Sequence, residues 1–207
     1  MTVNPDAGMY EITSDRDLLT ACERAIDVTY AAHPYYPARY ADRGRRLSSS
    51  DSGCLVHFAG EGREHAQEQI AWLSRVLAAR GMPTVLLEHH LAILAEEVAR
   101  LGNYPDVVDV LTVVSQQMRA ARVAVLGAET TDRLEADFDA ATRDEPGRVE
   151  HIGLLVVAAV ADEVRGLPRA ESSLMAWVAD VERFSAAWVE AAKMAAQQAR
   201  AAARPVS

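Results

Sequence analysis

Helical periodicity runs through nearly all of this 207-residue chain, and it limits the possible folds more than any other feature. The clearest pattern is a stripe from Leu87 to Leu101, in which apolar residues recur at spacings of four and three. Such spacing places the side chains on one face of an α-helix. A second stripe runs from Val107 to Met118 and continues at Val125. Because no segment shows the pattern of a strand, the sequence predicts an all-α protein of about eight helices.

Capping and turn residues predict where these helices begin and end. Ser14 is expected to cap a first helix that ends at His33-Pro34, because a residue before proline is disfavoured in the helical region. Ser49 or Ser50 is expected to cap a later helix. The helices after the first are expected near residues 38–47, 50–60, 63–79, 84–101, 105–126, 128–146, 148–165 and 170–199. The segment 148–165 is apolar almost all round, which predicts a central helix.

Composition and charge narrow the class of protein. Half of the residues are apolar and a quarter are charged, as in ordinary globular proteins. The net charge of −9 argues against nucleic acid or anionic membranes as partners. The longest apolar run, 152–161, is too short for a membrane span of ~20 residues, and the start of the sequence does not have the pattern of a signal peptide. Two cysteines, Cys22 and Cys54, form neither a disulfide framework nor a CxxC zinc motif, so we expect a reduced, cytoplasmic protein.

Histidine and cysteine are the candidates for chemistry. At ~100° per residue, His90 falls at the edge of the apolar stripe and His89 points nearly away from it. A single histidine such as His90 can hold a haem iron, with His57 near the other side, although His57 lies off the buried side of its own helix. The alternative, which we favour, is that both are hydrogen-bonded histidines at helix edges. Cys54 lies three residues before His57, but no third group orients the pair as catalysis requires.

Two polar groups of residues have alternative interpretations. Glu61, His65 and Glu68 share a helix face, which is more typical of a solvated surface than of a metal site. An arginine cluster either binds an anion or acidic partner or, as we favour, pairs internally with Asp42, Asp51 or a later acidic helix. The cluster consists of Arg39, Arg43, Arg45 and Arg46. The neighbouring tyrosines are expected to pack at a helix corner; they are Tyr30, Tyr35, Tyr36 and Tyr40.

The chain resembles a known domain in the order of its segments. These are RYADRGRR, SDSG, an apolar helix, WLSRVLAARGMP and a leucine-striped helix. It is similar to the helical domain that precedes vitamin B12-binding domains in bacterial sensory proteins and, loosely, to the globin and phycobiliprotein superfamily. The chain departs from these families because no DxHxxG motif for B12 follows and no cysteine for bilin lies in 47–50. We expect a single all-α domain over 14–198, in which the resemblance implies a globin-like part at 14–126, followed by additional helices at 127–198. The ends, 1–13 and 199–207, are expected to be disordered.

These observations lead to one functional expectation and two alternatives. We expect a non-enzymatic cytoplasmic sensor or regulatory protein that binds a small apolar ligand or a protein partner between helices 50–60 and 84–101. The candidate pocket residues are Cys54, Leu55, Phe58, Leu87, His90 and Leu94. The alternatives are a haem- or metal-binding protein, with His90 or His57 as ligand, and a helical-bundle enzyme. A homodimer through the late helices is also expected, because two-fold dimers are the commonest oligomers.

Overall fold

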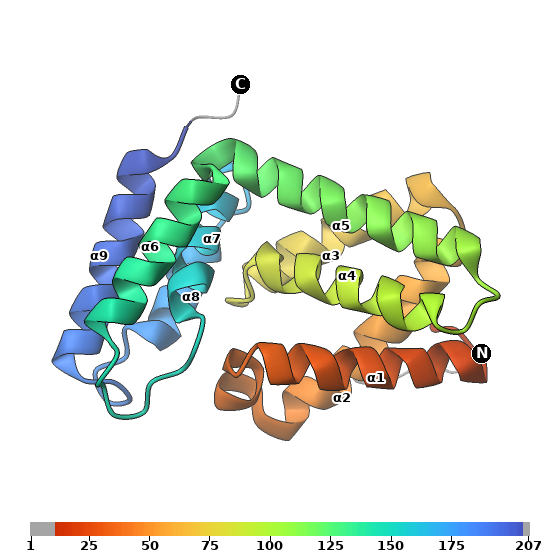
Figure 1. Cartoon of the computed structure of the whole chain (residues 1–207), viewed down its shortest axis with the longest axis horizontal. Helices are drawn as coiled ribbons and strands as arrows, with labels where there is room; N and C mark the ends of the chain where they lie inside the picture. The colour runs from red at the N-terminus through yellow and green to blue at the C-terminus, as the bar shows by residue number, and fades with distance from the viewer. Residues whose placement is uncertain (1–10, 205–207) are drawn as a thin grey trace. The chain divides into compact units, whose positions relative to one another are not determined.

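The structure is a computed structural model that describes residues 11–204, and within this range every regular element is an α-helix. Figure 1 labels the nine helices along the chain. They are α1 (Arg16–Ala32), α2 (Tyr35–Gly60), α3 (Arg63–Ala78), α4 (Thr84–Ala99), α5 (Pro105–Leu126), α6 (Ala128–Ala141), α7 (Ile152–Val164), α8 (Ala170–Val178) and α9 (Ala186–Ala202). The all-α class is confirmed. None of these helices combines the length and the apolar character needed to cross a bilayer.

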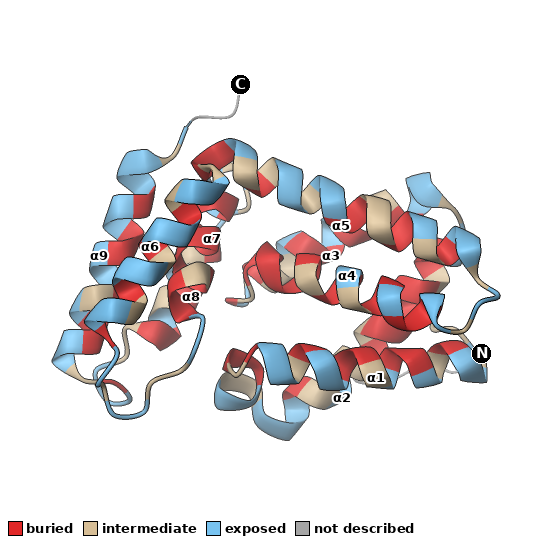
Figure 2. Cartoon of the chain, viewed as in Figure 1, coloured by how far each residue is buried: buried red, intermediate tan, exposed pale blue. Residues whose placement is uncertain are grey.

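Helix α1 has the boundaries expected from its sequence, with one change at the cap. Asp15, one residue after the predicted Ser14, accepts hydrogen bonds from the backbone N–H groups of Asp17 and Leu18. A carboxylate there also interacts favourably with the positive end of the helix dipole. At the other end α1 stops at Ala32, before the predicted proline break. In Figure 2, buried and exposed residues alternate along α1, as they do in a helix with one face in the core.

Helix α2 differs from its prediction, because the expected break near Ser49 and Ser50 is wrong. The element is continuous through these serines, and its only non-helical residue is Ala41, at φ 47° and ψ −146°. Directly after this kink, Gly44 lies close to Tyr40. A Cβ added at Gly44 would lie 2.6 Å from Tyr40 Cβ, so glycine is needed for this approach.

The last predicted helix, 170–199, is also wrong, because the structure divides it into α8 and α9. The Ser185 hydroxyl caps α9 by accepting from the N–H of Trp188, and the Trp188 indole donates to the Val178 carbonyl of α8 at 3.1 Å. Phe184 stacks on Trp188, with ring centroids 4.9 Å apart. Val181 lies in the connection between α8 and α9 and is 75% exposed.

The chain forms two compact units. Unit 1 comprises Met1–Trp72 and Leu87–Gln117, and unit 2 comprises Leu73–Leu86 and Met118–Ser207. Each change from one unit to the other falls inside α3, α4 or α5. The sequence-based division was different, because it predicted a single domain over 14–198 with a globin-like part at 14–126 and additional helices at 127–198.

In unit 1, α1 packs against α2, and the segment before α1 lies on α2 as well. The N–H of Thr13 donates to the Gly53 carbonyl at 3.2 Å, and a Cβ at Gly53 would lie 3.2 Å from that of Ile12. Residues 11–13 of the expected disordered N-terminus are therefore attached to α2. At the C-terminus, α9 continues to Ala202, and residues 1–10 and 205–207 lie outside the described part.

In unit 2, α7 is the central helix that its sequence predicts, and it packs against α6, α8 and α9. Gly153 allows α6 and α7 to approach closely, because a Cβ there would lie 2.9 Å from Phe138 Cβ. Near its other end, Asp162 is fully buried and accepts from the N–H and hydroxyl of Thr84, at 2.7 and 2.5 Å. Burial raises the pKa of Asp162, while the bonds from Thr84 oppose that rise. The carboxylate thereby holds the first turn of α4 within unit 2.

Candidate functional site

A buried polar cluster joins α1, α2 and α4 in the interior of unit 1. His90 of α4 lies between two hydroxyl groups, with Nδ1 2.8 Å from Thr29 Oγ1 and Nε2 2.7 Å from Ser52 Oγ. Each hydroxyl is also within hydrogen-bond distance of the carbonyl four residues earlier in its helix, at 2.7 Å for Thr29 and 2.8 Å for Ser52. We call Thr29, Ser52 and His90 the His90 cluster.

The number of protons in the His90 cluster determines which groups donate and which accept. Burial lowers the pKa of His90 to about 4, so the imidazole is neutral at pH 7. A neutral imidazole and two hydroxyls have three protons in total, and these serve four short contacts. One hydroxyl must therefore donate its proton to the ring, so it cannot donate to the carbonyl of its own helix. The other hydroxyl accepts the ring N–H and donates to the carbonyl of its own helix. The cluster is a neutral hydrogen-bonded chain across three helices.

The six predicted pocket residues all lie in unit 1, and all six are buried. They comprise Cys54, Leu55 and Phe58 on α2 and Leu87, His90 and Leu94 on α4. The His90 cluster adds a polar group to these otherwise apolar side chains. Thr29 and Ser52 were not recognised from the sequence. The feature of the sequence that could have identified Thr29 is its position, because it continues the buried stripe of α1 that contains Cys22 and Ile26.

The geometry at His90 also bears on the haem interpretation. Because a hydroxyl lies against each ring nitrogen, an iron atom would have to replace Thr29 or Ser52 as a partner. His57, the other predicted ligand, is half-buried, with Nε2 3.6 Å from a Glu11 carboxylate oxygen. Within residues 11–204, no group of three or more histidine, cysteine, aspartate and glutamate side chains is arranged to hold a metal ion.

Both thiols are buried in unit 1 and are not bonded to each other. Burial raises the pKa of Cys22 to about 12 and that of Cys54 to about 11. A nucleophilic cysteine requires the thiolate form, which these values disfavour at neutral pH. The environment of Cys54 is therefore that of a small apolar core residue.

A pair of histidines next to the His90 cluster was not predicted. His33, directly after α1, has Nε2 3.0 Å from Nδ1 of His89 on α4. His33 is buried and His89 is partly exposed. The helical wheel placed His89 away from the apolar stripe of α4, which is correct, but it gave no information on what His89 faces.

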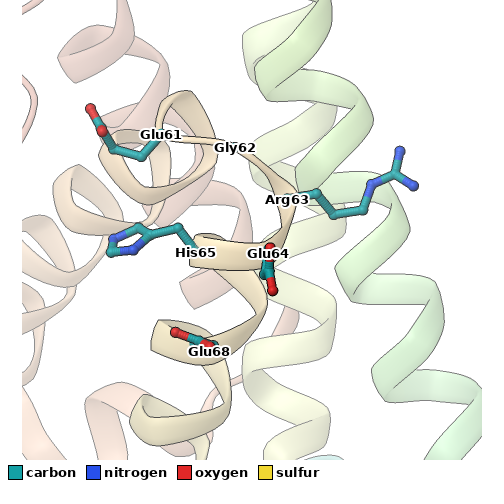
Figure 3. A pocket seen from close by; sticks show the side chains of 6 residues that line it. All are labelled: Glu61, Gly62, Arg63, Glu64, His65 and Glu68. Carbon is teal, nitrogen blue, oxygen red and sulfur yellow. The ribbon is translucent and has the colours of Figure 1, made fainter.

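The face shared by Glu61, His65 and Glu68 lines an open hollow of about 390 Å³ where α2 meets α3. Figure 3 shows its side chains, with Arg63 extending away from His65. The full lining consists of Glu61, Gly62, Arg63, Glu64, His65 and Glu68. Only Gly62 among these six is not exposed, which fits the predicted solvated surface.

The arginine cluster lies at the start of α2 and has two kinds of environment. Arg45 pairs with Asp27 of α1 at 2.6 Å and with Glu23 at 3.5 Å. The internal pairing is thus found for Arg45, although with acidic residues of the preceding helix. Arg39 donates to the Tyr35 hydroxyl and lies over the Tyr40 ring, 5.2 Å from its centroid.

The remaining two arginines, Arg43 and Arg46, are exposed. The tyrosines pack as predicted, because Tyr30 stacks on Tyr36 at 4.9 Å and Tyr35 meets Tyr40 edge-on at 5.9 Å. This corner of unit 1 is consequently held together by aromatic and cation–π contacts.

Comparisons of the chain with protein-family models, with curated proteins and with solved structures gave no match.

Proposed function

We propose that this chain is a non-enzymatic sensor or regulatory protein whose unit 1 binds a small, mainly apolar molecule between α2 and α4. The His90 cluster is the observation that carries the proposal. It contains the neutral imidazole of His90 and two hydroxyls, and the other five candidate residues are buried in the same unit. Ligand sites in proteins typically combine apolar walls with a few polar groups that orient the ligand.

The electrostatics favour binding over catalysis. A general base works best when its pKa is near the operating pH, whereas burial lowers the pKa of His90 to about 4. The raised pKa values of Cys22 and Cys54 likewise disfavour thiolate chemistry. A globin-like arrangement of unit 1, a cytoplasmic location and a homodimer belong to the same proposal.

Native mass spectrometry of the purified full-length chain, followed by titration with the neutral apolar dye N-phenyl-1-naphthylamine, tests this function. We expect one retained apolar molecule or, for emptied protein, one saturable dye site. Ser52→Ala should weaken binding, because it removes a hydroxyl of the His90 cluster. Ser115→Ala is a matched control, since Ser115 is also buried in unit 1 but donates to the Glu88 carbonyl.

Three results would contradict the proposal. The first is the absence of both a retained molecule and a dye site. The second is a Soret band that disappears in His90→Ala, which would establish the haem alternative. The third is turnover of a substrate that is lost in Cys54→Ser, which would establish an enzyme.

A further inference from the structure

We propose that His33 and His89 form a binding site for a divalent transition metal ion, with Zn²⁺ as the representative ion. The facing nitrogens, Nε2 of His33 and Nδ1 of His89, are 3.0 Å apart. Two imidazole nitrogens on tetrahedral Zn²⁺, each about 2.0–2.1 Å from the metal, lie about 3.3 Å apart. To take up the ion, the facing nitrogens must separate by about 0.3 Å, and the two rings, now at an interplanar angle of 21°, must turn so that both lone pairs point at the ion.

The backbone holds both histidines in place before any ion binds. His33 is the C-cap of α1, where its N–H donates to the Thr29 carbonyl and Pro34 follows it directly. His89 precedes His90 on α4, and His90 is bonded to Thr29 of α1. The Thr29–His90 contact thus fixes α1 against α4 close to both ligands. Thr29 lies one turn before His33, and His90 follows His89 directly. Such support from surrounding contacts is what a defined metal site requires.

The proton balance of the pair also permits metal binding. In the neutral pair each ring has one N–H, and one of these protons lies between the facing nitrogens. When the ion binds, that proton moves to the far nitrogen of its own ring, so both facing nitrogens present lone pairs. No proton is released from the neutral pair, whereas a protonated pair must lose one. Affinity should therefore fall as the pH is lowered.

Imidazole ligands suit zinc, copper and nickel, and because His89 is partly exposed we expect water to fill the remaining coordination positions. The bound ion would connect α1 to α4 within unit 1. The metal site has its own ligands, His33 and His89, but it shares the Thr29–His90 contact with the ligand position proposed between α2 and α4.

The test is isothermal titration of the chelator-treated, metal-free full-length protein with ZnCl₂. We expect one equivalent to bind, and we expect His33→Gln and His89→Gln each to weaken binding by at least about tenfold, a loss that even outer-shell changes produce. His57→Gln and His65→Gln are the controls and should bind as the wild type does. Circular dichroism checks the fold, and the less buried His89→Gln decides the matter if His33→Gln does not fold.

Two outcomes would overturn the proposal. One is the absence of saturable one-to-one binding in the wild type. The other is binding that persists in His89→Gln but is lost in His65→Gln, which would place the ion in the acidic hollow of α3.

Discussion

The close approach of α6 and α7 at Gly153 makes a quantitative prediction about unit 2. A Cβ at this position would lie 2.9 Å from Phe138 Cβ, 3.1 Å from Glu135 Cα and 3.2 Å from the Glu135 carbonyl oxygen. Two of these three atoms belong to the backbone of α6, so rotation of a side chain cannot relieve the contact. Gly153→Ala must therefore push the two helices apart.

The expected size of the effect follows from two opposing terms. Overpacking of a core costs about 1–3 kcal/mol, whereas alanine gains up to about 1 kcal/mol over glycine inside a helix. We expect Gly153→Ala to lower the free energy of unfolding by about 1–2 kcal/mol, or roughly tenfold in the equilibrium constant. Tryptophan fluorescence during urea denaturation measures this loss, because Trp188 contacts Phe138 edge-on at 5.1 Å.

Gly60→Ala provides a matched control, because Gly60 is also helical but has no heavy atom within 4 Å of its added Cβ. It should be as stable as the wild type or slightly more stable. The reasoning is refuted if Gly153→Ala unfolds at the same or a higher urea concentration than the wild type. It is equally refuted if both alanine variants lose the same stability.

Three further predictions concern buried polar groups. Because burial lowers the pKa of His90 to about 4 from about 6.5 in the unfolded chain, stability should be complete above pH 6.5 and fall toward pH 4 by up to about 3 kcal/mol. Urea denaturation across this range measures the loss, which should be absent in His90→Gln; an NMR titration of His90 near pH 6.5 would contradict it. Thr84→Val removes the hydroxyl bond to buried Asp162 and should cost about 1–3 kcal/mol by the same assay, so an unchanged midpoint refutes that role. The thiols of Cys22 and Cys54 should react slowly with Ellman's reagent at pH 8 in the folded chain and rapidly in urea, whereas fast reaction of either thiol in native protein would show an accessible thiolate.

Periodicity was a reliable guide where one face of a helix packs in the core. The stripe on α4 predicted that Leu87, Leu91 and Leu94 are buried, and all three are. The same reasoning identified α7 as central and placed His90 at a buried edge. These features depend only on the helical repeat of the sequence, which is why they could be predicted.

The wrong predictions have a common cause in contacts between helices. The serines at 48–52 are typical of caps, but Ser49 donates to Glu23 of α1 and Ser52 bonds His90 of α4, so α2 continues through them. Similarly, the spacing of Trp188 is consistent with one continuous helix from residue 170. Its indole N–H instead donates to the Val178 carbonyl, across the connection between α8 and α9. A helical wheel ranks residues by face and holds no information about partners on other helices.

The positions at which the chain changes units bear on how such a protein can evolve. Unit 1 consists of two separate stretches of sequence, and the stretch between them, Leu73–Leu86, belongs to unit 2. Every junction between the units lies inside a helix. A single genetic crossover therefore cannot exchange one unit for a foreign one without cutting through α3, α4 or α5.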